Sequence, residues 1–307
     1  MIEISVVIPV YNSEDNLAEL EKRLTQALIN IKYEIVLIND YSKDSSWDVI
    51  FKLTTQNKNI VGINLMKNFG QDNAIMAGLN VAQGNYIVIM DDDLQHSPFD
   101  IIKLYEECKK GYDVCYANFT KKKQALWKNI GSWLNGKVSE TIINKPKYLY
   151  LSPFKVISKQ VIDEVIKYHG PYPYVDGLIF SITSNITQID VEHHKRFEGK
   201  GNFNFFRSVT VFLKLATSFS VIPLRISSFI GFGVSLVGFM LAFYYLYQYL
   251  FSDNIVEGWT SLIVIILILG GLILLSLGLI GEYLGRTYLN LNKKPQFTIK
   301  HIVKNND

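Results

Sequence analysis

Two long stretches without a single charged residue, 226–252 and 258–281, limit the folds open to this chain of 307 residues. Each is long enough to cross the hydrocarbon core of a bilayer, about 30 Å thick, which takes roughly 20 apolar residues in a helix. A core helix of a soluble protein can also be apolar all round, but two in tandem favour a membrane anchor. The sequence therefore predicts a two-helix anchor behind a larger domain.

Basic residues flank this anchor on one side. Arg225 precedes the first apolar stretch and Arg286 follows the second, whereas the connecting segment 253–257 contains no Lys or Arg. The positive-inside rule then places both ends of the anchor in the cytoplasm. The N-terminus shows no basic segment followed by an apolar helix, so no cleaved signal is expected.

Charge and cysteine content disfavour two other classes of protein. The net charge of +3 is too small to indicate a nucleic-acid partner. Cys108 and Cys115 are the only cysteines and have no histidine beside them, which fits neither a zinc site nor a disulfide framework.

Short apolar runs alternate with helical patterns over roughly the first ninety residues, as in parallel strands joined by crossover helices. The expected strands are 4–10, 34–38, 60–65 and 86–90. Leucines recur every three or four residues after the first strand, which predicts a helix with Ser13 as its N-cap. A second helix is expected after Asp44 or Ser45, and a third over 71–82.

The remainder of the chain before the anchor is less regular. A helix is expected over 101–108 and a strand near Val114. The segment 203–220 reads as a helix that either lies in the membrane interface or packs on the globular domain. The predicted organisation is a main domain over 1–200, a juxtamembrane helix over 201–225, the anchor over 226–284 and a tail over 285–307.

Three consecutive acids, Asp91, Asp92 and Asp93, directly follow the fourth predicted strand. In an extended chain the first and third point the same way and can hold one Mg²⁺ or Mn²⁺, which usually shares its shell with substrate phosphates. The alternative is a solvated acidic loop. Asp40 ends the second strand, where it either meets a nucleotide or caps a helix. Ligands of open α/β sheets bind at these strand ends.

Several other nucleotide and hydrolase motifs are missing. No G-x-G-x-x-G follows the first strand, and neither a P-loop nor a G-x-S-x-G segment occurs. His193 and His194 are adjacent, so in a strand they face opposite sides and cannot share one metal.

Four segments resemble, in order and spacing, the successive motifs of inverting family 2 glycosyltransferases with the GT-A fold. They are Ser-Val-Val-Ile-Pro-Val-Tyr-Asn at 5–12, Asn-Asp-Tyr-Ser-Lys-Asp at 39–44, Asn-Phe-Gly-Gln at 68–71 and Asp-Asp-Asp-Leu-Gln at 91–95. Within that family the chain is similar to polyprenyl-phosphate glycosyltransferases such as dolichyl-phosphate mannose synthase and the bactoprenol glucosyl- and aminoarabinosyl-transferases. The resemblance extends to 223–225 before the apolar stretches and 281–286 after them.

The resemblance implies a GT-A catalytic domain, a mostly parallel α/β fold, and a role for each matching residue. The metal, Mg²⁺ or Mn²⁺, would be coordinated by Asp91, Asp93 and Gln95. The nucleotide-sugar donor would be contacted by Pro9, Tyr11, Asp40, Asp91 and Asp92.

On the acceptor side, the resemblance implies that Lys128, Ser132 and Arg196 bind the lipid phosphate. The final residues of the family's R-x-x-G-x-S-K-Y segment are replaced here, which shifts the expected phosphate contact towards Lys200. Many relatives also carry an acid shortly before a Phe-Arg pair, where this chain has Tyr-Leu-Ser-Pro-Phe-Lys at 150–155. A phosphate monoester has a second pKa of about 6 and is largely ionised, so it needs no base to deprotonate it.

The expected function is inverting transfer of a sugar from a UDP- or GDP-linked donor to undecaprenyl or dolichyl phosphate, for cell-envelope glycan or lipid modification. The expected location is the plasma membrane, the inner membrane of a bacterium, with a cytoplasmic catalytic domain; oligomers occur among relatives, but no number is implied. One alternative is a processive polysaccharide synthase, although the Q-x-x-R-W motif and further spans are missing. Another is a non-catalytic scaffold with a vestigial nucleotide fold, against which the intact Asp91 and Asp93 argue.

Overall fold

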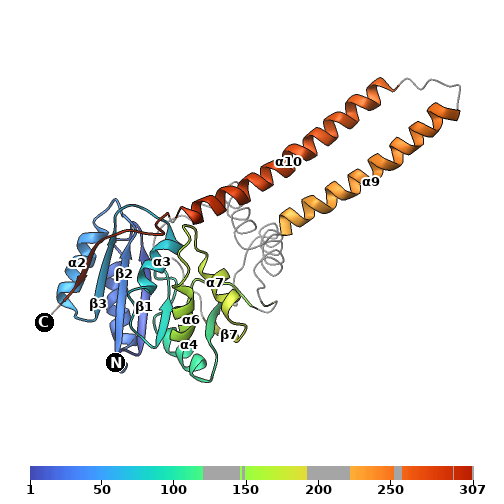
Figure 1. Ribbon diagram of the computed structural model, residues 1–307. Coiled ribbons are helices and arrows are strands. Elements are labelled where there is room, and N and C mark those ends of the chain that lie inside the picture. The colour runs from blue at the N-terminus through green and yellow to red at the C-terminus, as the bar shows by residue number, and fades with distance from the viewer. Residues whose placement is uncertain (120–145, 147–148, 192–221, 252–257, 293, 306–307) are drawn as a thin grey trace. The chain divides into compact units, whose positions relative to one another are not determined.

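The computed structural model describes the chain except for residues 120–145, 147–148, 192–221, 252–257, 293 and 306–307. It divides into two compact units (Figure 1). One unit consists of Met1–Phe203 together with Lys293–Asp307, and the other is Asn204–Asn292. Each unit is described separately below.

The first unit is built on an eight-stranded sheet with the order β7-β5-β6-β4-β1-β2-β3-β8. Its strands are β1 (Ile4–Val10), β2 (Tyr33–Asn39), β3 (Ile60–Leu65), β4 (Tyr86–Ile89), β5 (Val114–Phe119), β6 (Lys155–Ser158), β7 (Ile186–Val191) and β8 (Ile299–Lys304). The central strands β4, β1, β2 and β3 are parallel, whereas β6 runs antiparallel to β4 and β5. The predicted mostly parallel sheet is confirmed.

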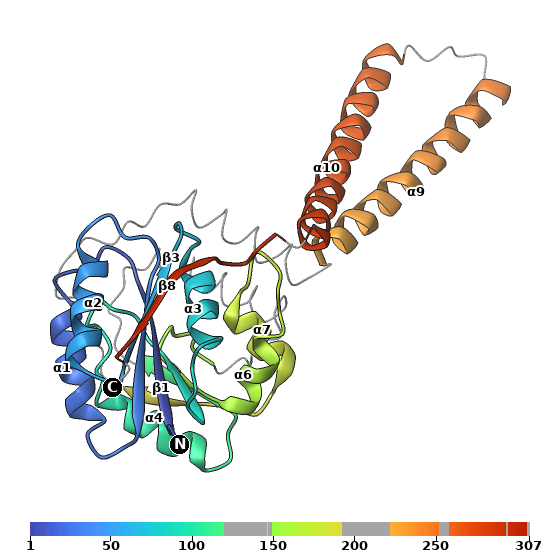
Figure 2. The same ribbon diagram turned by 60° about the vertical axis from the view of Figure 1, so that its left-hand side comes forward.

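Helices cover both faces of this sheet. They are α1 (Leu17–Ala27), α2 (Ser46–Gln56), α3 (Gln71–Leu79), α4 (Asp100–Lys109), α6 (Lys159–Val165) and α7 (Val175–Ile182). The leucines of α1 share a buried cluster with Ile101 and Leu104 of α4. Helix α3 packs on the other face, where a Cβ on Gly78 would lie only 2.6 Å from Val7. Figure 2 shows α1 and α2 on one side and α3, α6 and α7 on the other.

The start of α1 differs from the sequence-based expectation, whereas the start of α2 agrees with it. Helix α1 begins at Leu17 with Asn16 as its N-cap, and the Ser13 hydroxyl instead donates to the Tyr11 carbonyl at 3.4 Å, so the predicted Ser13 cap is wrong. The physical reason is a turn over 13–16, closed by the Asn16 amide on the Ser13 carbonyl at 3.1 Å, which delays the helix. At α2 the N-cap residue is Ser45, and the preceding Asp44 accepts the Ser46 amide at 3.1 Å.

A buried polar network lies near the start of β1 and β2. Glu34 is only 3% exposed, and its Oε1 accepts hydrogen bonds from the Ser5 hydroxyl and the Gln83 amide, both at 2.6 Å. The Gly84 amide donates to the Ser5 hydroxyl at 2.7 Å. Each polar group is therefore satisfied in a place that water does not reach.

Gly84 has no room for a side chain. A Cβ there would lie 2.6 Å from the Ser5 amide nitrogen and 2.7 Å from its Oγ. Backbone atoms cannot move away from an added Cβ as the end of a flexible side chain can. We therefore expect Gly84→Ala to lower the free energy of unfolding by about 1 to 3 kcal/mol. Thermal unfolding of the first unit measures this, with Gly231→Ala as the control because nothing lies within 4 Å of its Cβ position. An equal melting temperature for both variants would contradict the prediction.

The C-terminal segment differs from the expected tail over 285–307. Its first part continues as helix, and β8 then pairs antiparallel with β3 as the edge strand of the sheet. The Met66 amide donates to the Thr298 carbonyl at 2.9 Å, and Gln296, 8% exposed, donates to the Gly170 carbonyl at 3.0 Å. Polar and apolar residues do not alternate in β8, which reads Ile-Lys-His-Ile-Val-Lys, so sequence patterning predicts neither the strand nor its partner.

The second unit contains two long helices, α9 (Ile222–Phe251) and α10 (Trp259–Leu291). Both include windows long and apolar enough to cross a membrane, Leu224–Leu241 and Ile268–Leu289. Large apolar side chains such as Phe229 and Leu274 are more than two-thirds exposed, at 76% and 71%. The helix expected over 203–220 lies outside the described residues.

Candidate active site

The ends of β1, β2 and β4 meet at one edge of the sheet because these strands are parallel neighbours. Strand β4 ends at Ile89, and Asp91, Asp92 and Asp93 follow after one further residue. The Gln71 side-chain amide, from the first residue of α3, donates to Asp91 Oδ1 at 2.8 Å. The acids thus lie in a turn at this edge, not in continued strand.

The three carboxylates place a surplus of negative charge in a partly buried site. Burial, and then the Asp93 and Asp92 carboxylates, raise the pKa of Asp91 to about 7. Burial also raises the pKa of Asp92, whose Oδ2 is buried and accepts no hydrogen bond within the described part of the chain. Because a buried unsatisfied oxygen costs free energy, a bound cation would stabilise this arrangement.

The donor set fits a hard divalent cation. Asp91 and Asp93 provide carboxylate oxygens, and the Asp93 Oδ1 also accepts the Gln95 amide at 3.1 Å. Among the described residues no group of three or more His, Cys, Asp or Glu side chains could hold a metal ion by itself. Carboxylate oxygens are nevertheless the ligands that suit Mg²⁺ or Mn²⁺, and in proteins Mg²⁺ usually takes further ligands from substrate and water.

His96 supports this turn and was not identified from the sequence. It is 4% exposed and its ring stacks between Phe119, at 5.4 Å between centroids, and Phe154, at 5.3 Å. Its Nδ1 accepts the Asp91 amide at 3.4 Å. Leu94, between the acids and His96, has a φ of 57°, a left-handed backbone conformation that residues other than glycine rarely adopt. The aromatic stack fixes a strained turn that carries the acids.

The predicted nucleotide residues lie at the ends of the neighbouring strands. Pro9 belongs to β1, and Tyr11 just beyond it is 45% exposed. Asp40 follows β2 and is 3% exposed; its carboxylate accepts the Phe69 amide at 2.7 Å and the Gly70 amide at 2.9 Å. Asp40 therefore fixes the loop that starts α3, a role that the sequence did not indicate.

A second cluster of polar side chains lies beside β4, on the side away from β1. Lys155, at the start of β6, is 3% exposed and forms an ion pair with Asp176 of α7. The Tyr116 hydroxyl donates to the same Asp176 oxygen at 2.7 Å. Asp72 of α3 lies close enough for burial and the Asp176 carboxylate to raise its pKa to about 6. These residues are far apart in the sequence, so no local motif signals them.

The predicted acceptor residues Lys128, Ser132, Arg196 and Lys200 lie outside the described residues. Ser152 is 1% exposed and its hydroxyl accepts the Phe154 amide at 3.1 Å. Ser152 therefore holds the backbone just before β6.

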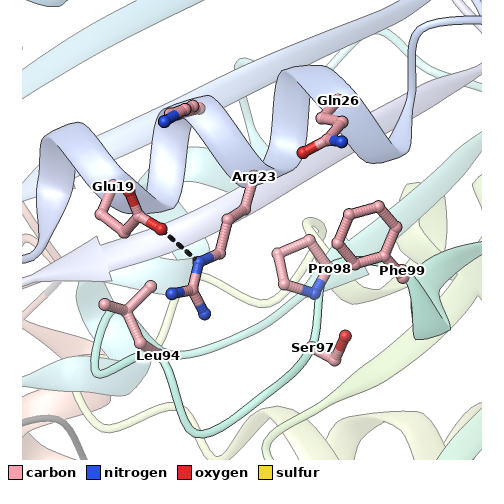
Figure 3. Close-up of a pocket in the computed structure, with 8 residues that line it drawn as sticks. Glu19, Arg23, Gln26, Leu94, Ser97, Pro98 and Phe99 are labelled. Atoms are coloured by element: carbon pink, nitrogen blue, oxygen red, sulfur yellow. Dashed lines mark hydrogen bonds and ion pairs between the residues drawn. The ribbon is translucent and has the colours of Figure 1, made fainter.

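A pocket of about 370 Å³ lies between α1 and the segment after the acids (Figure 3). Arg23 extends across it towards Leu94 and is paired with Glu19 at 2.7 Å. Ser97, Pro98 and Phe99 form the opposite wall. None of the predicted site residues lines this pocket, so it is separate from the strand-end site.

Comparison with known proteins agrees with this geometry. Residues 5–166 match the model of the family "Glycosyl transferase family 2". An uncharacterized glycosyltransferase of Bacillus subtilis is 33% identical to this chain, over 97% of this chain and 94% of the relative's length. The prophage bactoprenol glucosyl transferase homolog of Escherichia coli is 30% identical, over 99% of this chain and 100% of the relative's length. An undecaprenyl-phosphate 4-deoxy-4-formamido-L-arabinose transferase of Edwardsiella ictaluri is 31% identical, over 99% of this chain and 95% of the relative's length.

Solved structures share the fold at low sequence identity. Glucosyl-3-phosphoglycerate synthase from Mycobacterium tuberculosis, in complex with Mn²⁺, UDP-glucose and phosphoglyceric acid, has a TM-score of 0.52 and 13% identity. The match covers 70% of this chain and 78% of that chain. The first unit thus has the GT-A fold that the sequence predicts. With a family model that matches from β1 through α6 and relatives alike over nearly its whole length, the chain belongs to glycosyl transferase family 2.

Proposed function

We propose that this protein transfers a sugar from a nucleotide-diphosphate sugar to a polyprenyl phosphate. The observation that carries the proposal is the acidic turn Asp91, Asp92 and Asp93 at the carboxyl end of β4, in a chain whose relatives include named bactoprenol and undecaprenyl-phosphate sugar transferases. A structural neighbour binds Mn²⁺ and UDP-glucose, which supports a nucleotide-sugar donor with a divalent cation.

The donor would lie along the strand ends. Asp91, Asp93 and Gln95 would hold Mg²⁺ or Mn²⁺, which when bound neutralises charge on the departing diphosphate. Gln71 orients Asp91 through its hydrogen bond at 2.8 Å. Pro9, Tyr11, Asp40 and Asp92 would contact the nucleotide, a uridine or guanosine diphosphate.

The acceptor phosphate attacks the anomeric carbon in a single displacement with inversion. Its oxygen is already ionised near neutral pH, so the protein needs to position it and not to deprotonate it. Lys128, Ser132 and Arg196, with Lys200, would bind this phosphate. Helices α9 and α10 would cross the bilayer with both ends in the cytoplasm, bringing the lipid headgroup to the catalytic unit.

The test is to screen UDP- and GDP-linked sugars, radiolabelled in the sugar, with the detergent-solubilised full chain, Mn²⁺ and undecaprenyl or dolichyl phosphate. We expect label in an organic-extractable product that depends on the lipid phosphate. Long, water-soluble polymer as the product would point to a polysaccharide synthase. Failure of both UDP and GDP to bind would point to a non-catalytic scaffold. Either result would refute the proposal.

His96 is expected to act as a positioning residue. His96→Phe keeps an aromatic ring between Phe119 and Phe154 but removes the acceptor for the Asp91 amide. Because a neutral hydrogen bond contributes about 0.5 to 1.5 kcal/mol, we expect kcat to fall by about two- to tenfold. Steady-state kinetics, with the melting temperature as a control for folding, measure this. A wild-type kcat would show that the hydrogen bond is dispensable.

A further inference from the structure

The order of strands gives the bound donor a direction; this step rests on the proposed function. The predicted nucleotide contacts lie at the ends of β1 and β2, and the three acids follow β4 on the opposite side of β1. A nucleotide-diphosphate sugar is linear in the order nucleoside, diphosphate, sugar. With the nucleoside over β1 and β2 and the diphosphate at β4, the sugar extends towards the next strand, which is β6.

At that point β6 presents a buried cation. Lys155 is in register with Ile89, the last residue of β4, and so lies close to the acidic turn. Its ammonium pairs with Asp176 Oδ1 and lies 5.0 Å from the centroid of the Tyr116 ring. The Tyr116 hydroxyl donates to the same oxygen at 2.7 Å. A buried ammonium needs such partners, and they fix Asp176 in one orientation.

Asp72 completes this side of the site. It is the residue after Gln71, which binds Asp91, and its Oδ1 accepts the Val175 amide at 3.4 Å. The first turn of α3 thus spans the space between the acidic turn and the start of α7. Burial, and then the Asp176 carboxylate, raise the pKa of Asp72, and the Lys155 ammonium that pairs with Asp176 offsets this only in part.

The second carboxylate oxygens of Asp72 and Asp176 can each accept a further hydrogen bond. Within the described residues, Asp72 and Asp176 each use only Oδ1 as an acceptor, and Asp176 retains 17% side-chain exposure. A purely structural ion pair would consist of Lys155 and Asp176 alone, because one ammonium balances one carboxylate. Asp72 adds a second carboxylate, so the group is acidic as well as polar.

We propose that Asp72 and Asp176 bind the sugar of the donor through its hydroxyl or amino groups and reject sugars that carry a carboxylate. Ionised carboxylates accept strong hydrogen bonds from sugar hydroxyls, and they repel a further anion in a site of low dielectric constant. The substrate class is therefore a neutral or amino sugar, not a hexuronic acid. Lys155 and Tyr116 hold Asp176 in place for this role.

The experiment uses the full chain in detergent with Mn²⁺ and lipid phosphate. Donors are the nucleotide sugar that gives the most product and the hexuronate with the same base, UDP-glucuronate or GDP-mannuronate. For Asp72→Asn we expect kcat/KM with the preferred donor to fall about 10- to 100-fold, as for loss of a charged hydrogen bond. The Kd of free UDP or GDP should stay within about twofold, and the preference over the hexuronate should shrink about tenfold.

Asp163→Asn is the matched control, because Asp163 pairs with Lys159 on α6 and its side chain is 53% exposed. Asp72→Ser serves as a second variant if the Asn protein melts at a lower temperature. An unchanged donor preference in a folded, active Asp72 variant would overturn this inference and leave the proposed function intact. A wild-type chain that binds neither diphosphate and forms no product would refute both.

Discussion

Asp91→Asn is expected to reduce glycolipid formation by at least about a hundredfold, because under the proposed function it would remove a charged ligand from the cation that would neutralise the leaving diphosphate. The Asn side chain keeps an oxygen for the Gln71 amide, which lies 2.8 Å from Asp91 Oδ1, so the turn should persist. Asp93→Asn should behave alike. Initial rates of transfer into the organic phase, measured across a Mn²⁺ titration, test this prediction.

The same titration separates a catalytic from a structural effect. The variants should need a higher Mn²⁺ concentration for half-maximal rate, while their melting temperatures in the absence of metal should not fall. The pKa of Asp91 is raised first by burial and then by the Asp93 and Asp92 carboxylates, so relief of this repulsion should even increase stability slightly. Transfer within about twofold of the wild-type rate would exclude Asp91 as a metal ligand.

Lys155→Met should destabilise the catalytic unit by about 3 to 5 kcal/mol, because it leaves the Asp176 carboxylate without its buried cation. Lys159→Met is a matched control four residues away. Lys159 also forms an ion pair, with Asp163 at 3.3 Å, but its side chain is 35% exposed. Such an exposed pair contributes about 0 to 1 kcal/mol. Urea unfolding of the two variants, followed by tryptophan fluorescence, compares these costs directly.

Adding Asp176→Asn to Lys155→Met should recover part of the loss, because the double variant leaves no unpaired buried charge. Lys155→Arg should retain more stability than Lys155→Met, since it keeps a cation near Tyr116 and Asp176. If Lys155→Met and Lys159→Met lost stability equally, the buried pair would have no special energetic role.

The sequence predicts the central sheet well, and the reason is local. Strands β1 and β3 begin and end where their mostly apolar runs do, because a strand buried on both faces is nearly continuously apolar. Strand β8 is half exposed and follows a long apolar helix, so nothing nearby marks it as part of the sheet. Its pairing with β3 depends on contacts distant in sequence.

The residues of the candidate site divide in the same way, into those that a local pattern predicts and those that it does not. Asp91 and Asp93 follow a buried strand directly, and that local pattern predicts their place at the sheet edge. The Lys155 and Asp176 pair joins β6 to α7, and His96 is held by rings from elsewhere in the chain. These residues are placed by tertiary packing, which no spacing rule along the sequence encodes.

The pairing of β8 with β3 also has a consequence for biosynthesis. Since β8 is translated after α9 and α10, the ribosome must deliver both hydrophobic helices before the catalytic sheet acquires its outermost strand. Until then β3 presents an open edge, the kind of surface on which nascent chains aggregate. Synthesis of the two long apolar helices and completion of the sheet are therefore sequential events in one polypeptide.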